Sequence, residues 1–364
     1  MPTPKFQYLK NLENLALTAS KINQNLRVQV VCSGLPFGNG EANDIFYEFF
    51  RRSWLSSHPE LAALPVVGHG NNCLPTIHVT DLAQCVRTLA EAREAPSKQY
   101  FVAVDECKNK TQVEIMRAIS ATLGSGAVKH VNLQDVLSEE WVEILTLDLN
   151  IAPSDEFLGI EWHCRDGITA ETMPSLNLEF NHFRGLFPLK VFIGGPPVSG
   201  KTHFATKLCQ AYGIPHLRIA DMISEASLAE DDLAAEIKNK IEELKDAEVA
   251  AYEKTRKKKD PDLDREKLKP RLPDELLQQI VRAKINSPAC MNKGFILDGF
   301  PRNQEDAKAI FLDAIPGEDE NRQGELEGHE GFRANEKIMP QYVVIFEGDD
   351  AYLKLRAKEI SALP

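Results

Sequence analysis

The chain has 364 residues, a length that favours two domains, and its 43% hydrophobic and 26% charged residues are typical of a soluble globular protein. Acidic residues outnumber basic ones by 54 to 42, and the net charge of −12 disfavours binding to nucleic acid or to an anionic membrane surface. No apolar stretch is long enough to span a membrane, the N-terminus lacks the apolar core of a secretory signal, and the seven scattered cysteines favour a reducing, cytoplasmic setting.

Apolar runs alternate with amphipathic runs along the first half of the chain. They predict a buried strand at residues 28–34, a helix at 45–55, a strand at 100–104 and a helix at 111–123. Strands that alternate with helices form parallel sheets with crossover connections, so we expect an α/β fold. The less regular segment 148–183 is expected to supply the closing elements of the first domain.

The second half continues the alternation, and we expect it to be α/β as well. Short apolar strands are predicted at 190–193, 294–297 and 342–346, and a helix at 202–212. The domain boundary is expected near residues 185–188, which gives domains at 1–186 and 187–364.

Two polar stretches interrupt the second half. Residues 225–273 are dense in charge, and a solvated helical hairpin is favoured there over a basic docking patch centred on residues 254–259. Residues 317–336 contain little that could form a core and are expected to be a mobile acidic loop.

A glycine-rich loop follows the strand predicted at 190–193. Its residues fit the pattern G-x-x-x-x-G-K-[ST] at each constrained position: Gly195, Pro196, Pro197, Val198, Ser199, Gly200, Lys201 and Thr202. A strand before the loop and a helix after it are the context in which this pattern binds nucleotide phosphates. The sequence therefore predicts an ATP-binding loop rather than an empty glycine-rich turn.

The chemistry of this loop follows from its residue types. Gly195 and Gly200 let the backbone approach phosphate oxygens, and the loop N–H groups form an anion nest at the start of a helix. Lys201 supplies a positive charge for the β- and γ-phosphates, and the Thr202 hydroxyl can bind Mg²⁺.

A second cluster lies at residues 294–302. Asp298 ends a strand, where its carboxylate can hold Mg²⁺ through water. Gly299 leaves room for a ligand, and Arg302 offers a planar guanidinium suited to a phosphate.

Together with residues 212–216 and 220–223, these motifs resemble adenylate kinases and related nucleoside monophosphate kinases across residues 190–364. The resemblance implies a P-loop fold with a parallel sheet, transfer of the ATP γ-phosphoryl group to AMP, and Mg²⁺ as cofactor. It implies catalytic roles for Lys201 and Arg302, and a contact of Arg356 with the ATP adenine. It also implies an AMP site formed by these residues: Asp221, Gly299, Phe300 and Arg302.

Three departures from the kinase pattern bear on the AMP site. Ser224 stands where the family usually has an arginine, and Asp306 stands where it has a glutamine that reads adenine, with Gln304 out of register. The chain also ends before the lid and its two further arginines would follow. Nucleotide binding is therefore expected more firmly than turnover.

Residues 75–83 resemble a conserved stretch of extended short-chain dehydrogenases and sugar-nucleotide epimerases, which implies a partial Rossmann-like first domain. The first half contains no G-x-x-G-x-x-G turn for a dinucleotide, and Phe6 stands where that family has its catalytic tyrosine. We therefore expect no NAD, disfavour an active NAD-dependent reductase or epimerase, and interpret His78 and Asp81 as structural.

The two halves in this order resemble the long adenylate kinases of the isoenzyme seven type, a family associated with motile cilia and flagella. The resemblance implies ATP and AMP as ligands, and axonemal or ciliary proteins as partners. Two hypotheses follow: an adenylate kinase, or a catalytically weak nucleotide-binding component of an axonemal complex.

Overall fold

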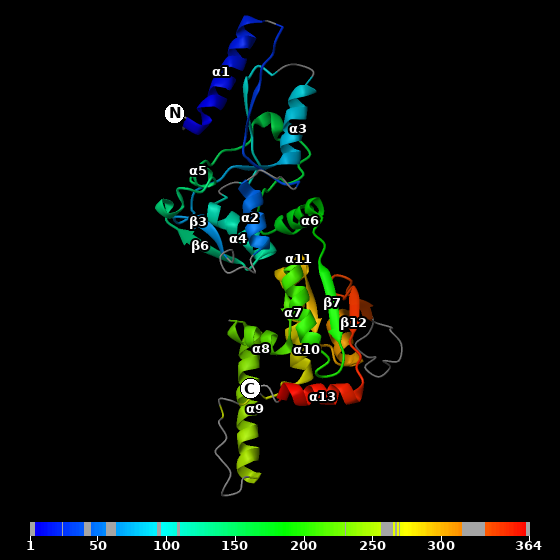
Figure 1. The fold of residues 1–364 in the computed structure, drawn as a ribbon. Coiled ribbons are helices and arrows are strands. Elements are labelled where there is room, and N and C mark those ends of the chain that lie inside the picture. Colours follow the sequence, from blue (N-terminus) through cyan, green and yellow to red (C-terminus); the bar gives the residue numbers. More distant parts are fainter. Residues whose placement is uncertain are drawn as a thin grey trace. The chain divides into compact units, whose positions relative to one another are not determined.

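The computed structural model describes residues 4–23, 25–39, 45–55, 63–92, 96–107, 110–229, 231–255, 265, 268, 270–314 and 332–361. The chain divides into two compact units, residues 1–186 and 187–364 (Figure 1). Both units mix helices with parallel strand pairs, so the predicted α/β fold class is confirmed.

The N-terminal unit contains helices and short strands in mixed order. Its strands are β1 (Val30–Ser33), β2 (Leu35–Phe37), β3 (Ala63–Val67), β4 (Thr76–His78), β5 (Tyr100–Ala103) and β6 (Ala127–Val131). Its helices are α1 (Gln7–Ile22), α2 (Ile45–Trp54), α3 (Val79–Ala90), α4 (Gln112–Leu123), α5 (Val142–Leu145) and α6 (Met173–Arg184), with short 3₁₀ turns at Pro4–Phe6, Leu133–Val136 and Asp155–Phe157. The strands pair in parallel as β1–β5, β2–β4 and β3–β6.

Aromatic side chains fill the core of this unit. Phe37, Phe46 and Phe49 are fully buried, and α2 packs on α4 beside β3. The irregular segment 148–183 belongs to this unit and includes most of α6, as expected. A strand was expected at residues 28–34, and β1 lies within that range. The expectation that this strand is buried is wrong, because β1 pairs with β5 in a two-stranded sheet and Cys32 and Ser33 are exposed.

The C-terminal unit is built on one larger sheet. Its strands are β7 (Leu189–Gly194), β8 (His216–Leu217), β9 (Gly294–Asp298), β10 (Leu312–Ala314), β11 (Phe332–Ala334) and β12 (Tyr342–Ile345). Its helices are α7 (Lys201–Tyr212), α8 (Ile219–Leu228), α9 (Asp232–Thr255), α10 (Asp274–Ile285), α11 (Pro288–Lys293), α12 (Gln304–Phe311) and α13 (Asp350–Ser361). The sheet order is β12-β7-β9-β8 with all neighbours parallel, and β10 pairs antiparallel with β11.

The core of this unit lies around β9. Phe295, Ile296 and Leu297 of that strand are buried, and α8 and α10 pack against each other over the same core. The apolar strand β12 lies at the edge of the sheet, and each of its four side chains is exposed.

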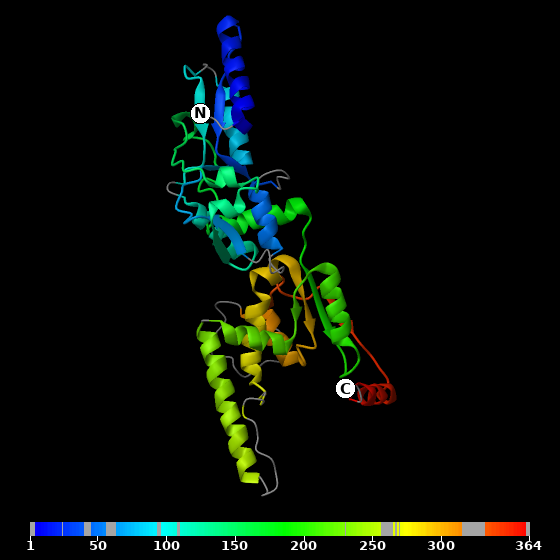
Figure 2. The ribbon, with the colours of Figure 1, turned by 60° about the vertical axis from the view of Figure 1, so that its left-hand side comes forward.

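The charge-dense segment is helical over α9, which projects from the rest of its unit in both views (Figure 2). The side chains of residues 254–259 lie outside the described part of the chain, so the docking-patch alternative is untested. Residues 315–331, most of the predicted acidic loop, also lie outside it. Among the described helices, none is both long and apolar enough to cross a membrane.

Candidate functional site

The predicted phosphate loop and the second cluster follow two neighbouring strands. β7 and β9 pair in parallel with Ile193 opposite Asp298, so the segments that leave their carboxyl ends emerge side by side. Ligands bind at this end of parallel sheets, because the loops there open a crevice. A cavity of about 500 Å³ lies at this place; its lining includes Gly194, Gly195, Gly299 and Arg302.

The loop backbone has the conformation that its glycines permit. Gly195 and Gly200 have φ angles of +137° and +100°, and Val198 has a φ of +57°. A Cβ on Gly195 would lie 2.5 Å from the carbonyl oxygen of Phe346, so only glycine fits there without movement. The loop therefore owes its path to both positive φ angles and close packing on the segment after β12.

Polar groups of the loop are available to a phosphate. Helix α7 begins at Lys201, so its first N–H groups face the loop. The Lys201 Nζ donates to the carbonyl oxygens of Gly195 and Pro196, at 2.7 Å each. The Ser199 Oγ is buried and has no hydrogen-bond partner, which is costly unless a ligand or water supplies one. Lys201 and Ser199 thus fit an anion in the loop.

The last helix, α13, brings a further basic side chain to the loop. Arg356 of α13 lies beside the loop, with guanidinium nitrogens 3.6 and 3.8 Å from the place of a Cβ on Gly200. Phe204 and Phe346 lie next to each other, with ring centroids 5.3 Å apart. The structure therefore brings Arg356 close to Gly200, although the two residues are far apart in the sequence.

The second cluster lies opposite the loop. Arg302 is 4.0 Å from the Asp274 carboxylate, and its guanidinium lies over the Phe300 ring at 5.5 Å. The position that a Cβ would take on Gly299 is 3.6 Å from the Lys201 Cε, so loop and turn are in near contact. Phe300 was expected to line the AMP site, but its side chain is 1% exposed and belongs to the core, so only its backbone can face a ligand.

Asp298 and Thr202 were predicted to hold Mg²⁺. The Asp298 carboxylate is nearly buried at the end of β9 and accepts a hydrogen bond from the His216 Nε2 at 3.2 Å, if that nitrogen carries the proton. Carboxylate and hydroxyl oxygens are donors that Mg²⁺ accepts. The residue types fit a hydrated Mg²⁺ between the loop and β9.

The remaining predicted AMP residue is already paired. Arg218 donates two hydrogen bonds to Asp221, at 2.6 and 2.9 Å, and this bonding lowers the pKa of Asp221. Ser224 donates to the carbonyl oxygen of Ala220 within its own helix. Neither side chain replaces the arginine that the kinase pattern has at residue 224.

Asp306 has a structural role. It is 2% exposed and accepts hydrogen bonds from the Gln278 side chain at 3.0 Å and from the Arg302 N–H at 3.2 Å. Its own N–H donates to Asn303, the N-cap residue of α12. Asp306 therefore holds the turn that carries Arg302 and does not face the cavity as a base-reading group.

Sequence reasoning missed the residues that pair with the predicted ones. Asp274 and Gln278 lie in α10, and Arg218 directly precedes α8; no pattern in the sequence marks these three residues. His216 lies in the stretch 212–216 that carries the kinase resemblance, but its contact with Asp298 was not predicted.

His78 and Asp81 of the N-terminal unit have structural contacts. Asp81 is fully buried and accepts hydrogen bonds from the backbone N–H groups of His163 and Cys164, at 2.6 and 2.9 Å. His78 is the N-cap of α3, where its Nδ1 accepts from the Thr80 N–H at 3.2 Å. These contacts fix the start of α3 and the loop that carries His163.

Comparison with known proteins identifies relatives along the whole chain. Adenylate kinase 7 of Mus musculus is 31% identical over 369 residues, covering 98% of this chain and 58% of that protein. Adenylate kinase 7 of Macaca fascicularis is 30% identical and covers 95% of this chain and 64% of the relative. The chain thus spans about three fifths of the length of these two curated relatives.

Shorter matches cover parts of the chain. An adenylate kinase of Thermosipho melanesiensis is 35% identical over 120 residues, 33% of this chain and 44% of that enzyme. The crystal structure of a human epimerase family protein, SDR39U1 with NADPH, is similar at a TM-score of 0.35 and 19% identity, covering 42% of this chain and 49% of that one. No family model matches the chain.

The match to adenylate kinase 7 runs through both units, in the order that the sequence motifs predict. The resemblance to adenylate kinases of the isoenzyme seven type is confirmed: 95–98% of this chain aligns with adenylate kinase 7.

Proposed function

We propose that the C-terminal unit is a nucleoside monophosphate kinase of the adenylate kinase type, which transfers the γ-phosphoryl group of ATP to AMP. The observation that carries this proposal is the cavity of about 500 Å³, lined both by Gly195 of the phosphate loop and by Arg302 of the turn after β9. A phosphoryl donor on one side and an acceptor on the other would meet in this space.

The chain's own residues would act by positioning and by charge. The loop N–H groups and Lys201 would hold the ATP phosphates, and Lys201 would exchange its present bonds to two loop carbonyls for phosphate oxygens. Arg302 would hold the AMP phosphate, and Arg356 would pack on the adenine of ATP. The protein forms no covalent intermediate in this chemistry. Catalysis therefore depends on holding the two nucleotides in line and on neutralising the charge of the transferred phosphoryl group.

Mg²⁺ would neutralise charge on the transferred phosphoryl group when bound. Thr202 and, through water, Asp298 are the residues proposed to hold it, and His216 orients the Asp298 carboxylate.

The test is a coupled assay of ADP formation from ATP and AMP with Mg²⁺, on the full chain and on Lys201→Met. We expect turnover in the parent and a loss of about a hundredfold or more in the variant, since a charge on the transferred group is lost. Equal rates in the two proteins would refute the assigned site.

A second candidate is a nucleotide-binding structural component with little turnover. Two contacts favour this candidate. Asp306 is hydrogen-bonded to Gln278, and the Ser224 hydroxyl is hydrogen-bonded to Ala220 of its own helix. Neither side chain is therefore available to bind the base or the phosphate of AMP. Calorimetric titrations distinguish the two candidates: a kinase binds both Mg·ATP and AMP, whereas the structural component binds Mg·ATP with no detectable heat from AMP.

The resemblance to isoenzyme seven further suggests motile cilia or flagella as the location and axonemal proteins as partners. Expression of the tagged chain in ciliated cells tests this: axonemal staining supports it, and staining confined to the cell body contradicts it.

A further inference from the structure

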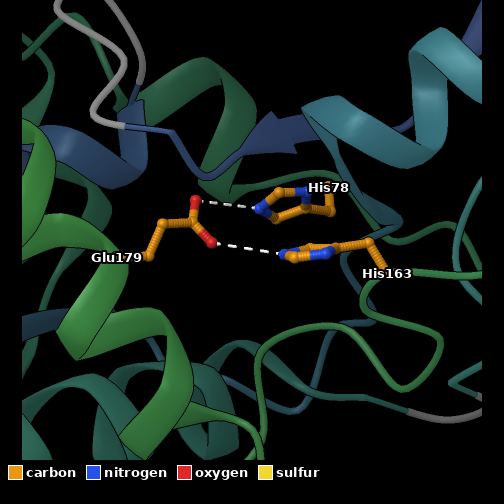
Figure 3. A group of neighbouring side chains, drawn as sticks. All are labelled: His78, His163 and Glu179. Atoms are coloured by element: carbon orange, nitrogen blue, oxygen red, sulfur yellow. Dashed lines mark hydrogen bonds and ion pairs between the residues drawn. The ribbon is translucent and has the colours of Figure 1, made fainter.

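Two histidines and a glutamate meet in the N-terminal unit, whereas the phosphate loop belongs to the C-terminal unit. His78 lies at the end of β4, His163 lies in the loop before α6, and Glu179 projects from α6 toward both rings (Figure 3). Of the described residues, these form the one group of three in which ligand atoms from His, Cys, Asp or Glu all lie within 4.8 Å of one another.

We propose that His78, His163 and Glu179 bind a divalent transition-metal ion of the zinc type. Two imidazoles and a carboxylate form a ligand set that zinc uses in proteins when a fourth position stays open to water. The half-exposed His163 side chain gives the ion a path from solvent, while the other two side chains are 0% and 15% exposed.

The distances suit such an ion. The Glu179 carboxylate oxygens lie 3.0 Å from the His78 Nε2 and 3.4 Å from the His163 Nε2. Ligand atoms about 2.1 Å from a tetrahedral zinc are separated by about 3.4 Å, so small movements of the side chains would accommodate it. Movement is easiest for His163, which is the most exposed of the three.

Neighbouring groups hold each ligand in place. The Asn39 N–H donates to Glu179, and Asp81 fixes the backbone of the loop that carries His163. Gly38 has a φ of +98°, and a Cβ there would lie 1.9 Å from the His78 Nε2, so the backbone packs directly on this ring. Ligands oriented by a second layer of contacts are typical of metal sites.

Charge also favours a cation at this place. The acidic Glu179 side chain is 15% exposed and faces both histidine rings (Figure 3). A carboxylate beside two imidazoles offers a divalent cation one anionic and two neutral ligands.

Metal binding makes a specific demand on His78. Its Nδ1 accepts from the Thr80 N–H, which places the ring proton on Nε2, where it is donated to Glu179. Coordination through Nε2 requires that proton to move to Nδ1, so the 3.2 Å bond from Thr80 is lost. A change of tautomer at His78 is therefore a direct signature of the proposed site.

The test uses the full chain without an affinity tag and titrates Zn²⁺ against a chromophoric chelator. His163→Ala and Glu179→Gln each remove one proposed ligand without removing an apolar core side chain. The matched control is His182→Ala, because His182 is an exposed histidine in α6, the helix that carries Glu179. We expect the parent and the control to bind one more equivalent than the two ligand variants, with an affinity at least tenfold above any residual binding. Nitrogen-15 NMR of the histidine rings should show His78 changing tautomer when Zn²⁺ is added.

Millimolar Mg²⁺ should compete poorly, because hard cations prefer oxygen ligands. Equal Zn²⁺ stoichiometry and affinity in the parent, His163→Ala and Glu179→Gln would overturn the proposal and place any bound Zn²⁺ elsewhere on the chain. An unchanged His78 tautomer in the Zn²⁺-bound protein would overturn it as well. The proposed metal site belongs to the N-terminal unit, and Lys201 belongs to the C-terminal unit. Mg·ATP binding is measured in a separate titration, so the outcome for one proposal does not decide the other.

Discussion

A methyl group added to Gly195 should disable the nucleotide site. The Cβ in Gly195→Ala would lie 2.5 Å from the Phe346 carbonyl oxygen and 2.9 Å from its Cβ, at a φ of +137° that L-residues rarely adopt. Backbone strain of this kind costs about 1–3 kcal/mol, and the overlap with backbone atoms adds to it. The loop must move away from the segment after β12 to relieve both.

The expected effect is of the order of 3 kcal/mol, about a hundredfold weaker binding of Mg·ATP, because the displaced loop no longer presents its N–H groups together. Isothermal calorimetry measures the affinity, and thermal unfolding reports whether the C-terminal unit stays folded. Gly213→Ala is the control: Gly213 also has a positive φ, of +64°, but no atom lies within 4 Å of its Cβ position. It should lower stability by about 1 kcal/mol and leave ATP binding unchanged. Parent-like ATP affinity in Gly195→Ala would refute the reasoning.

The other predictions concern the N-terminal unit. The Thr111 side chain caps α4 in a capping box, so Thr111→Ala should lower the free energy of unfolding by about 1 kcal/mol in a denaturant titration, and an unchanged midpoint would contradict the cap. The lowered pKa of Glu179 contributes stability that is present above its ordinary value of 4.5 and is lost as the pH falls through the folded-state pKa. Glu179→Gln should therefore lose less stability than the parent on acidification below about pH 4.5, and parallel pH profiles would argue against this contribution. Lys110 and Asp105 form an ion pair in which both side chains are 3% exposed, so Lys110→Met leaves a buried carboxylate without its cation and should cost about 3–5 kcal/mol of stability. The double variant with Asp105→Asn should recover part of that loss, and an additive loss would contradict the pairing.

The strand, loop and helix around the phosphate-loop motif were predictable because the signals are local. The order of strand, glycine-rich loop and helix requires neighbouring residues only, and the structure places α7 directly after Gly200. The second cluster was predictable because it also follows an apolar strand. The second cluster lies beside the phosphate loop because β7 pairs with β9. The periodicity of apolar residues does not specify which strands pair.

The parts that escaped prediction depend on contacts between distant segments. Asp306 looked like a changed base-reading position, yet the structure shows it bonded to Gln278 from another helix. Phe300 looked like a ligand contact, but the turn directs its ring into the core. The meeting of His163 with Glu179 joins a loop to a helix, and no spacing in the sequence signals it.

Calorimetric titration of Mg·ATP into the full chain and into Lys201→Met tests the central claim most directly. The account predicts a saturable heat with one nucleotide per chain in the parent, and affinity reduced by at least tenfold when the Lys201 ammonium is lost. An absence of heat in the parent, or equal affinity in the two proteins, would contradict it.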